Sequence, residues 1–329
     1  MFMRIAPNLL LIFYIGKGIF LETKNRRSVS TIICICALLV ACIAVLELYF
    51  NKNIIYDRYI RSPYYTHEIF WAHRPVSTQF HPAILGTYFL CAIPFALALT
   101  RERSVSIKVL GWSVFALCST LTFLARSRGA FVGLIALFLF YAWNKGYKKI
   151  FFSVISLVIL VGALGSFQSD ATLGKFGFSR LISGSHDSAI SPYRLDRIKM
   201  SLKIVKEYPV FGIGYNHFRL RFNEYCAPES RNTIFMLKIP DNMYLSFLAE
   251  TGIVGLSGFL IFSIVIFMRG ARALKSKTGI QREWILIPFT AYVAVLVQMW
   301  AYEFFYWSSP SMFFFLLCGF IQAAALSVE

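Results

Sequence analysis

Charged residues are scarce in this sequence, and acidic residues are the scarcest of them. Asp, Glu, Lys and Arg make up 15% of the 329 residues, whereas 57% are hydrophobic and the mean hydropathy is +0.62. This composition excludes an ordinary soluble domain and indicates an integral membrane protein. The 33 basic residues outnumber the 16 acidic ones. Because many of the basic residues fall in short loops between apolar runs, membrane topology accounts for the excess, and no nucleic-acid partner is expected.

Signatures of disulfide, metal and nucleotide chemistry are also missing. Of the seven cysteines, all but Cys226 lie within apolar runs, so there is neither a disulfide framework nor a zinc spacing. The five histidines lack the HExxH spacing, and the chain has no Walker A motif and no serine nucleophile elbow. We therefore expect no metal, no cofactor and no use of cytoplasmic ATP.

Apolar runs recur from one end of the chain to the other. By the criterion of roughly 20 residues for a spanning helix, about nine transmembrane helices are expected. They cover residues 5–21, 29–50, 82–99, 107–125, 129–143, 150–166, 245–268, 284–302 and 310–327. The first run lacks a cleavage site, so we interpret it as a retained helix. The sequence thus predicts an all-α polytopic membrane helix bundle, a single domain over residues 1–329 that contains one large loop at residues 167–243.

Basic loops predict the topology of this bundle. When the expected helices alternate across the membrane, four basic segments fall on one side, namely residues 24–27, 101–108, 145–149 and 269–282. The positive-inside rule assigns that side to the cytoplasm. The segment 51–81, the turn 126–128 and the loop 167–243 are then expected on the outer face.

The large loop contains a predicted amphipathic helix. Ser191 and Pro192 are typical of a helix start, and Pro209 is expected to end the helix. Its apolar stripe consists of Leu195, Ile198, Leu202 and Val205. Most of its basic residues avoid the stripe, which is typical of a helix that lies along a membrane surface and contacts lipid. No strand is expected before Gly212-x-Gly214, so these glycines are only a weak signal for nucleotide binding. They predict a tight turn instead.

Four arginines on the predicted outer side are candidate anion ligands. Arg126 and Arg128 flank Ser127, which is placed to cap the following helix, and a helix N-terminus adds partial positive charge that favours a phosphate. The alternative is that both arginines reach lipid head groups. Arg194 and Arg197 lie three residues apart on the loop helix. By spacing alone they are either anion ligands or part of a solvated basic face.

Carboxylates and one histidine are the candidate proton acceptors. Asp241 stands where the large loop re-enters the membrane, where burial would raise its pKa and suit it as a base. From sequence alone, its more ordinary interpretation is the N-cap of the following helix. Glu250 and Glu303 lie in or near apolar helices, where either is expected to hold an arginine. His217 is a further candidate base, with simple solvation as its alternative.

The combination of these motifs resembles the O-antigen ligase and O-antigen polymerase superfamily. The resemblance rests on Ser127-Arg128-Gly129 before an apolar helix, Arg194 ahead of Pro209, the run from Pro209 to Gly214, Asp241-Asn242-Met243-Tyr244-Leu245, and Glu250-Thr251-Gly252. It covers roughly residues 80–329, and fewer helices than usual precede this region.

This resemblance implies a GT-C-like fold and a bacterial cytoplasmic (inner) membrane protein whose catalytic loop faces outward. It implies inverting, metal-independent transfer or polymerisation of glycan from an undecaprenyl-diphosphate-linked donor to a glycan or lipid A-core acceptor. Arg128 and Arg194 match the positions that hold the diphosphate. Asp241 stands where ligases carry the histidine that activates the acceptor hydroxyl, and Ile198 stands where the family often has tryptophan. The first of these departures leaves a polymerase or a divergent transferase open.

The expected roles follow from the resemblance and from the chemistry together. Arg128 and Arg194 are expected to clamp the diphosphate and Asp241 to act as the base. Supporting, substrate-binding roles are expected for Arg126, Arg197, His217 and Glu250. Two other classes of function stay open. A polysaccharide or lipid-linked oligosaccharide transporter would require charged residues within several helices and broken helices in mid-membrane. A non-catalytic membrane scaffold would not require the outward arginines.

Overall fold

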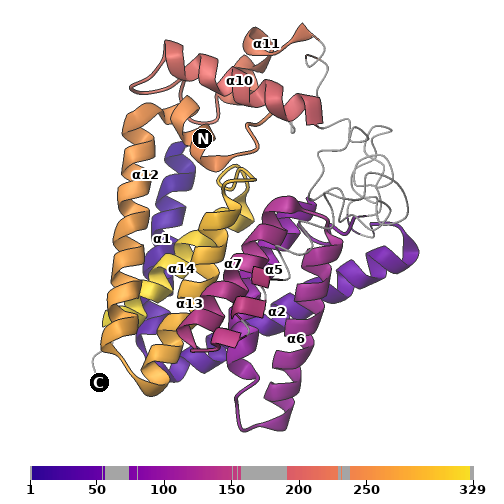
Figure 1. Cartoon of the computed structure of the whole chain (residues 1–329), viewed down its shortest axis with the longest axis vertical. Coiled ribbons are helices and arrows are strands. Elements are labelled where there is room, and N and C mark those ends of the chain that lie inside the picture. The colour runs from indigo at the N-terminus through magenta and orange to yellow at the C-terminus, as the bar shows by residue number, and fades with distance from the viewer. Residues whose placement is uncertain are drawn as a thin grey trace. The chain divides into compact units, whose positions relative to one another are not determined.

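The computed structural model describes residues 2–53, 55, 74–79, 81–149, 151–153, 155–156, 191–228, 231 and 238–326. Within these ranges the chain is helical and contains no strand, which confirms the all-α expectation (Figure 1). The helices are α1 (Phe2–Leu21), α2 (Thr23–Phe50), α5 (Pro82–Leu99), α6 (Val105–Leu124), α7 (Arg128–Asn144), α10 (Ser191–Glu207), α11 (Phe218–Tyr225), α12 (Met243–Ser276), α13 (Gly279–Gln298) and α14 (Ser308–Leu326).

Six helices in the described part of the chain are long and apolar enough to cross a membrane, so the protein is a multi-pass membrane protein. They cover Lys24–Phe50, Pro82–Leu99, Val105–Leu124, Met243–Ser276, Gly279–Gln298 and Ser308–Leu326. Two shorter apolar helices, Asn8–Leu21 and Arg128–Asn144, fall on predicted runs. The run expected at 150–166 lies largely outside the described residues, so the count of about nine spans is not confirmed.

The basic segment 24–27 does not form the loop that we expected. It lies inside α2, which begins at Thr23, directly after α1. The side chain of Arg26 is fully buried, and its Nε donates a hydrogen bond to the carbonyl of Phe20 at 2.9 Å. This arginine therefore satisfies a carbonyl at the end of α1, where helix carbonyls lack partners within the helix.

The chain divides into two compact units, which are described separately. Unit 1 comprises Met1–Tyr141, Ile264–Gln298 and Trp307–Glu329. Its central helix is α5, which is buried over most of its length and packs against α2, α6 and α13. The rings of Phe20 in α1 and Phe320 in α14 stack with centroids 4.4 Å apart. The interior of unit 1 is thus a conventional helix-on-helix packing of apolar side chains.

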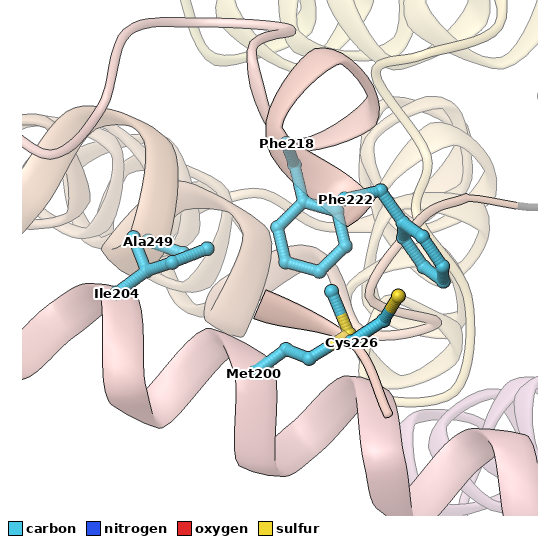
Figure 2. Close-up of a cluster of buried hydrophobic side chains, with 6 residues drawn as sticks. All are labelled: Met200, Ile204, Phe218, Phe222, Cys226 and Ala249. Carbon is cyan, nitrogen blue, oxygen red and sulfur yellow. The ribbon is translucent and has the colours of Figure 1, made fainter. Parts of the chain in front are cut away.

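Unit 2 comprises Ala142–Ser263 and Met299–Tyr306. Its described core joins α10, α11 and the first part of α12, as Figure 2 shows. The buried side chains are those of Met200, Ile204, Phe218, Phe222, Cys226 and Ala249. Of the predicted stripe of α10, Val205 packs against this core, whereas Leu195, Ile198 and Leu202 are exposed. An apolar face that no protein covers is typical of a helix in contact with lipid.

Helix α12 is broken at Gly252, where φ is 63° and ψ is −167°. The break frees backbone groups on both sides, and the turn after α10 satisfies them. Ile213 and Gly214 donate their N–H groups to the carbonyls of Ala249 and Glu250 at 3.1 and 2.8 Å. In return, the N–H groups of Ile253 and Val254 donate to the carbonyls of Pro209 and Val210 at 2.9 and 3.3 Å. The run from Pro209 to Gly214 is therefore tied to α12 through its backbone.

Glycine is required on both sides of this contact. A Cβ on Gly252 would lie 2.1 Å from the carbonyl oxygen of Val210, and a Cβ on Gly212 would lie 2.4 Å from the carbonyl carbon of Glu250. Both residues also have a positive φ. The expected tight turn at Gly212-x-Gly214 is present, but its main consequence is a close approach to a distant segment.

Candidate active site

Arg126 and Arg128 belong to unit 1, at the start of α7. The N–H of Ala130 donates to Ser127 Oγ at 3.4 Å, and the N–H of Phe131 donates to the Ser127 carbonyl at 2.9 Å. Ser127 therefore caps α7, as the sequence indicated. Arg126 is exposed and has a φ of 47°, while Arg128 is the first residue of α7 and is half-buried. Both guanidinium groups are thus carried by a capped helix N-terminus, which favours anions.

Arg197 belongs to unit 2 and forms an ion pair with Asp241. Its NH1 group donates to the Asp241 Oδ2, and the arginine side chain is only 7% exposed. The Nε of Arg197 is also buried and has no hydrogen-bond partner among the residues that the structure describes. The buried guanidinium therefore keeps a donor for a further acceptor. Arg194 lies in the first turn of α10, but its side chain is outside the described set.

Asn242, rather than Asp241, is the cap of α12. The Asn242 Oδ1 accepts the N–H of Leu245 at 3.0 Å, and its Nδ2 donates to the carbonyl of Trp300 at 2.9 Å. The cap interpretation of Asp241 was therefore wrong by one residue. Asp241 has a φ of 58°, which turns the chain just before the helix. Its carboxylate is thereby left to pair with Arg197.

Glu250 organises the loop that precedes α11. Its carboxylate accepts the N–H of Asn216 at 2.8 Å, the N–H of Phe218 at 2.9 Å and the hydroxyl of Tyr306. These backbone donors are at the start of α11, where N–H groups need an acceptor from outside the helix. Glu250 therefore fixes the loop before α11 through these hydrogen bonds, and the charge of Arg219 acts on its carboxyl as well.

His217 is exposed, and its Nδ1 lies 3.1 Å from the carbonyl of Tyr215. Its backbone carbonyl accepts the N–H groups of Leu220 and Arg221 at 3.0 Å each. The residue therefore opens α11, and its ring lies on the accessible side of that turn. Its ring takes no part in the ion pair of Arg197 and Asp241.

Two residues that sequence reasoning missed complete this part of unit 2. The guanidinium of Arg219 lies 4.7 Å from the centre of the Tyr306 ring, which also stacks on Tyr215 with ring centres 6.3 Å apart. Burial and the neighbouring Glu250 carboxylate raise the pKa of Tyr306 well above its ordinary value, so its hydroxyl stays a donor. No local motif marks either residue, because their packing depends on segments distant in sequence.

Glu303 lies in the connection between α13 and α14. It is fully buried, and neither carboxylate oxygen has a hydrogen-bond partner among the described residues. We expected it to pair with an arginine, and in the described structure it forms no such ion pair. In the same ranges, no three His, Cys, Asp or Glu side chains gather as metal ligands would.

Comparison with known proteins identifies one family. Residues 113–260 match the family model described as O-antigen ligase, which confirms the resemblance over this part of the chain. The matched region contains all seven residues predicted to serve in the site, and Glu303 lies beyond it. No curated protein matches the sequence significantly.

Proposed function

Because residues 113–260 match the O-antigen ligase family, we propose that this protein is a membrane glycosyltransferase of the O-antigen ligase or polymerase type. It takes glycan from an undecaprenyl-diphosphate-linked donor at the outer face of the bacterial cytoplasmic membrane. The acceptor is a further glycan or a lipid A-core. Residues 1–329 act as one membrane domain, in which the loop 167–243 faces outward.

The observation that carries this proposal is the pair formed by Arg197 and Asp241. A carboxylate that caps no helix lies against a buried guanidinium whose Nε has no partner among the described residues. Together they offer a carboxylate that can accept a proton and an N–H group that can bind an anion. Departure of a lipid diphosphate builds negative charge, which preorganised arginines stabilise.

In the proposed reaction, Arg128 and Arg194 hold the donor diphosphate, and Arg126 and Arg197 add positive charge. Asp241 removes the proton from the acceptor hydroxyl as its oxygen attacks the anomeric carbon. The bond from that carbon to the diphosphate breaks, and the diphosphate leaves with the electron pair. Attack from the opposite side inverts the anomeric centre, and no metal enters any step. His217 and Glu250 shape the substrate-binding loop.

A transporter is the main competitor, because a broken helix is one of its marks. The break in α12 argues against this use. The carbonyls freed at Ala249 and Glu250 already accept hydrogen bonds from Ile213 and Gly214. A transporter would present such carbonyls to its cargo, whereas here they fix a loop.

Alanine variants test the assignment directly. In a host whose own enzyme is deleted, Arg128→Ala, Arg194→Ala and Asp241→Ala should each abolish long surface glycan while the protein stays inserted. The matched control is Lys206→Ala, which removes an exposed basic side chain from the same loop helix and should leave glycan unchanged. Normal long glycan in all three site variants would sink the catalytic proposal.

The deletion phenotype separates the two activities. Loss of a ligase leaves long polymer on the lipid carrier, whereas loss of a polymerase leaves single repeat units. Gel analysis of the carrier-linked and surface fractions distinguishes these outcomes.

A further inference from the structure

The segment that carries Glu303 is bonded to the start of α12. The N–H of Met243 donates to the carbonyl of Met299 at 2.9 Å, and Asn242 Nδ2 donates to the carbonyl of Trp300. The N–H of Phe304 contacts the Met243 sulfur at 3.2 Å. These contacts join the segment 299–306 to the residues that follow Asp241. Glu303 is therefore placed by backbone contacts on both sides and not by its own side chain.

Four charged or titratable groups face this buried carboxyl. Asp241 precedes α12, Arg197 comes from α10, Arg219 from α11, and Tyr306 from the same connection. Burial is the main effect and the Asp241 charge the second, and together they raise the pKa of Glu303 to about 8. The Glu303 backbone N–H and the charges of Arg197 and Arg219 oppose this shift more weakly.

An ionised Glu303 side chain would be strongly destabilised in this position. It is fully buried, and neither oxygen forms a hydrogen bond of standard geometry with a described residue. A buried carboxylate without hydrogen bonds is destabilised relative to its protonated form. Glu47 in unit 1 is the counterexample, since its buried carboxylate accepts the N–H groups of Val76 and Ser77.

We propose that Glu303 is a positioning residue that carries a proton at neutral pH, so that it adds no second negative charge beside the ion pair of Arg197 and Asp241. This inference rests on the proposed function. Asp241 takes the acceptor proton in the proposed reaction, and Glu303 itself gives and takes no proton during transfer. Its neutrality limits the negative charge near Arg197, where the donor diphosphate binds.

Ionisation of Glu303 would act mainly on donor binding. A second carboxylate would repel the diphosphate and compete with it for Arg197. As pH rises through about 8, the ionised fraction of Glu303 grows. The KM for the lipid diphosphate donor should then rise with pH, by up to about tenfold per pH unit. This is the limit because each unit above the pKa lowers the protonated fraction about tenfold. The kcat should change less.

The experiment compares the pH dependence of donor KM in purified wild-type enzyme, Glu303→Gln and Glu224→Gln. Glutamine keeps the shape of a protonated carboxyl and cannot ionise. Glu303→Gln should keep wild-type KM at pH 7 and lose the rise above pH 8. Glu224 is an exposed glutamate of α11, and its replacement should leave the rise unchanged. An unchanged alkaline rise in Glu303→Gln, or inactivity of that folded variant at pH 7, overturns the inference.

Infrared spectroscopy gives a readout that does not need transfer. The wild-type protein should show the carbonyl band of a protonated carboxyl at pH 7, which fades as pH passes 8 and is missing in Glu303→Gln. Absence of any band difference between these proteins refutes the assignment even if transfer is intact. If wild-type protein transfers no glycan but the band is present, the proposed function fails and the protonation of Glu303 stands.

Discussion

The two units bury a glutamate in opposite ways. In unit 1, the Glu47 carboxylate is 1% exposed and accepts Asn53 Nδ2 at 2.9 Å, the Val76 N–H at 3.0 Å and the Ser77 N–H at 2.6 Å. In unit 2, Glu303 is equally buried and accepts nothing from the described residues. A satisfied carboxylate fixes a loop to a helix, whereas an unsatisfied one is retained at a cost. The comparison separates a structural role from a functional one.

Backbone groups show the same contrast. In unit 1, the buried helix α5 is continuous from Pro82 to Leu99, although Pro94 inside it removes one backbone N–H. In unit 2, α12 breaks at Gly252 and depends on the run from Pro209 to Gly214 for its partners. Unit 2 therefore depends on contacts between distant segments.

The largest expected effect is on stability, from Glu47→Ala. This change leaves the buried N–H groups of Val76 and Ser77 without their acceptor, and each such loss costs about 1–3 kcal/mol. The free energy of unfolding should fall by about 4 kcal/mol, which thermal unfolding in detergent would detect. Glu303→Gln is the matched change in unit 2 and should not lower it at pH 7, because it removes a group whose ionisation in the unfolded chain favours unfolding. Equal damage from both variants would remove the distinction between the two glutamates.

The next effect is expected from Gly252→Ala. The backbone conformation of Gly252 is nearly exclusive to glycine, and the added Cβ would meet the Val210 carbonyl oxygen at 2.1 Å. We expect a loss of about 3 kcal/mol and loss of glycan transfer. Gly258 lies on the same helix, and a methyl group added there would have nothing within 4 Å, so Gly258→Ala should be neutral or stabilise by up to about 1 kcal/mol. A tolerated Gly252→Ala would show that the break in α12 is not needed.

The sequence was most informative where a local pattern determines local structure. Ser127 before an apolar run predicted the cap of α7, and Pro209 predicted the end of α10, because both effects act within one turn of helix. The sequence did not distinguish Asp241 from its neighbour Asn242 as the cap of α12, and the prediction of Asp241 was wrong. Both residue types cap helices and both tolerate a positive φ, so composition does not say which one turns the chain.

Other parts of the site depend on segments that meet only in the folded chain. Gly212 was a weak signal because its partner is Glu250 in α12, and no pattern near Gly212 shows that contact. Periodicity alone also did not show which face of α10 packs against protein and which is exposed. The buried side includes Arg197 and Ser201 beside Met200, so polarity does not mark it. The segment that carries Glu303 is bound by Met243 and Asn242, which donate to the carbonyls of Met299 and Trp300.

Per pH unit, the smallest expected effect is a slope of stability that Glu303 adds to unit 2. Its pKa is about 8 in the folded chain, against an ordinary value of 4.5, so between these limits the folded state keeps a proton that the unfolded chain has lost. The free energy of unfolding should therefore fall as pH rises through this window, by at most about 1.4 kcal/mol per unit, and this contribution should level off above pH 8. Glu303→Gln should flatten the slope and Glu224→Gln should not. Thermal unfolding of the wild type and the two variants from pH 5 to about 9 measures this slope. Parallel curves would mean that Glu303 has the same pKa in the folded and unfolded states.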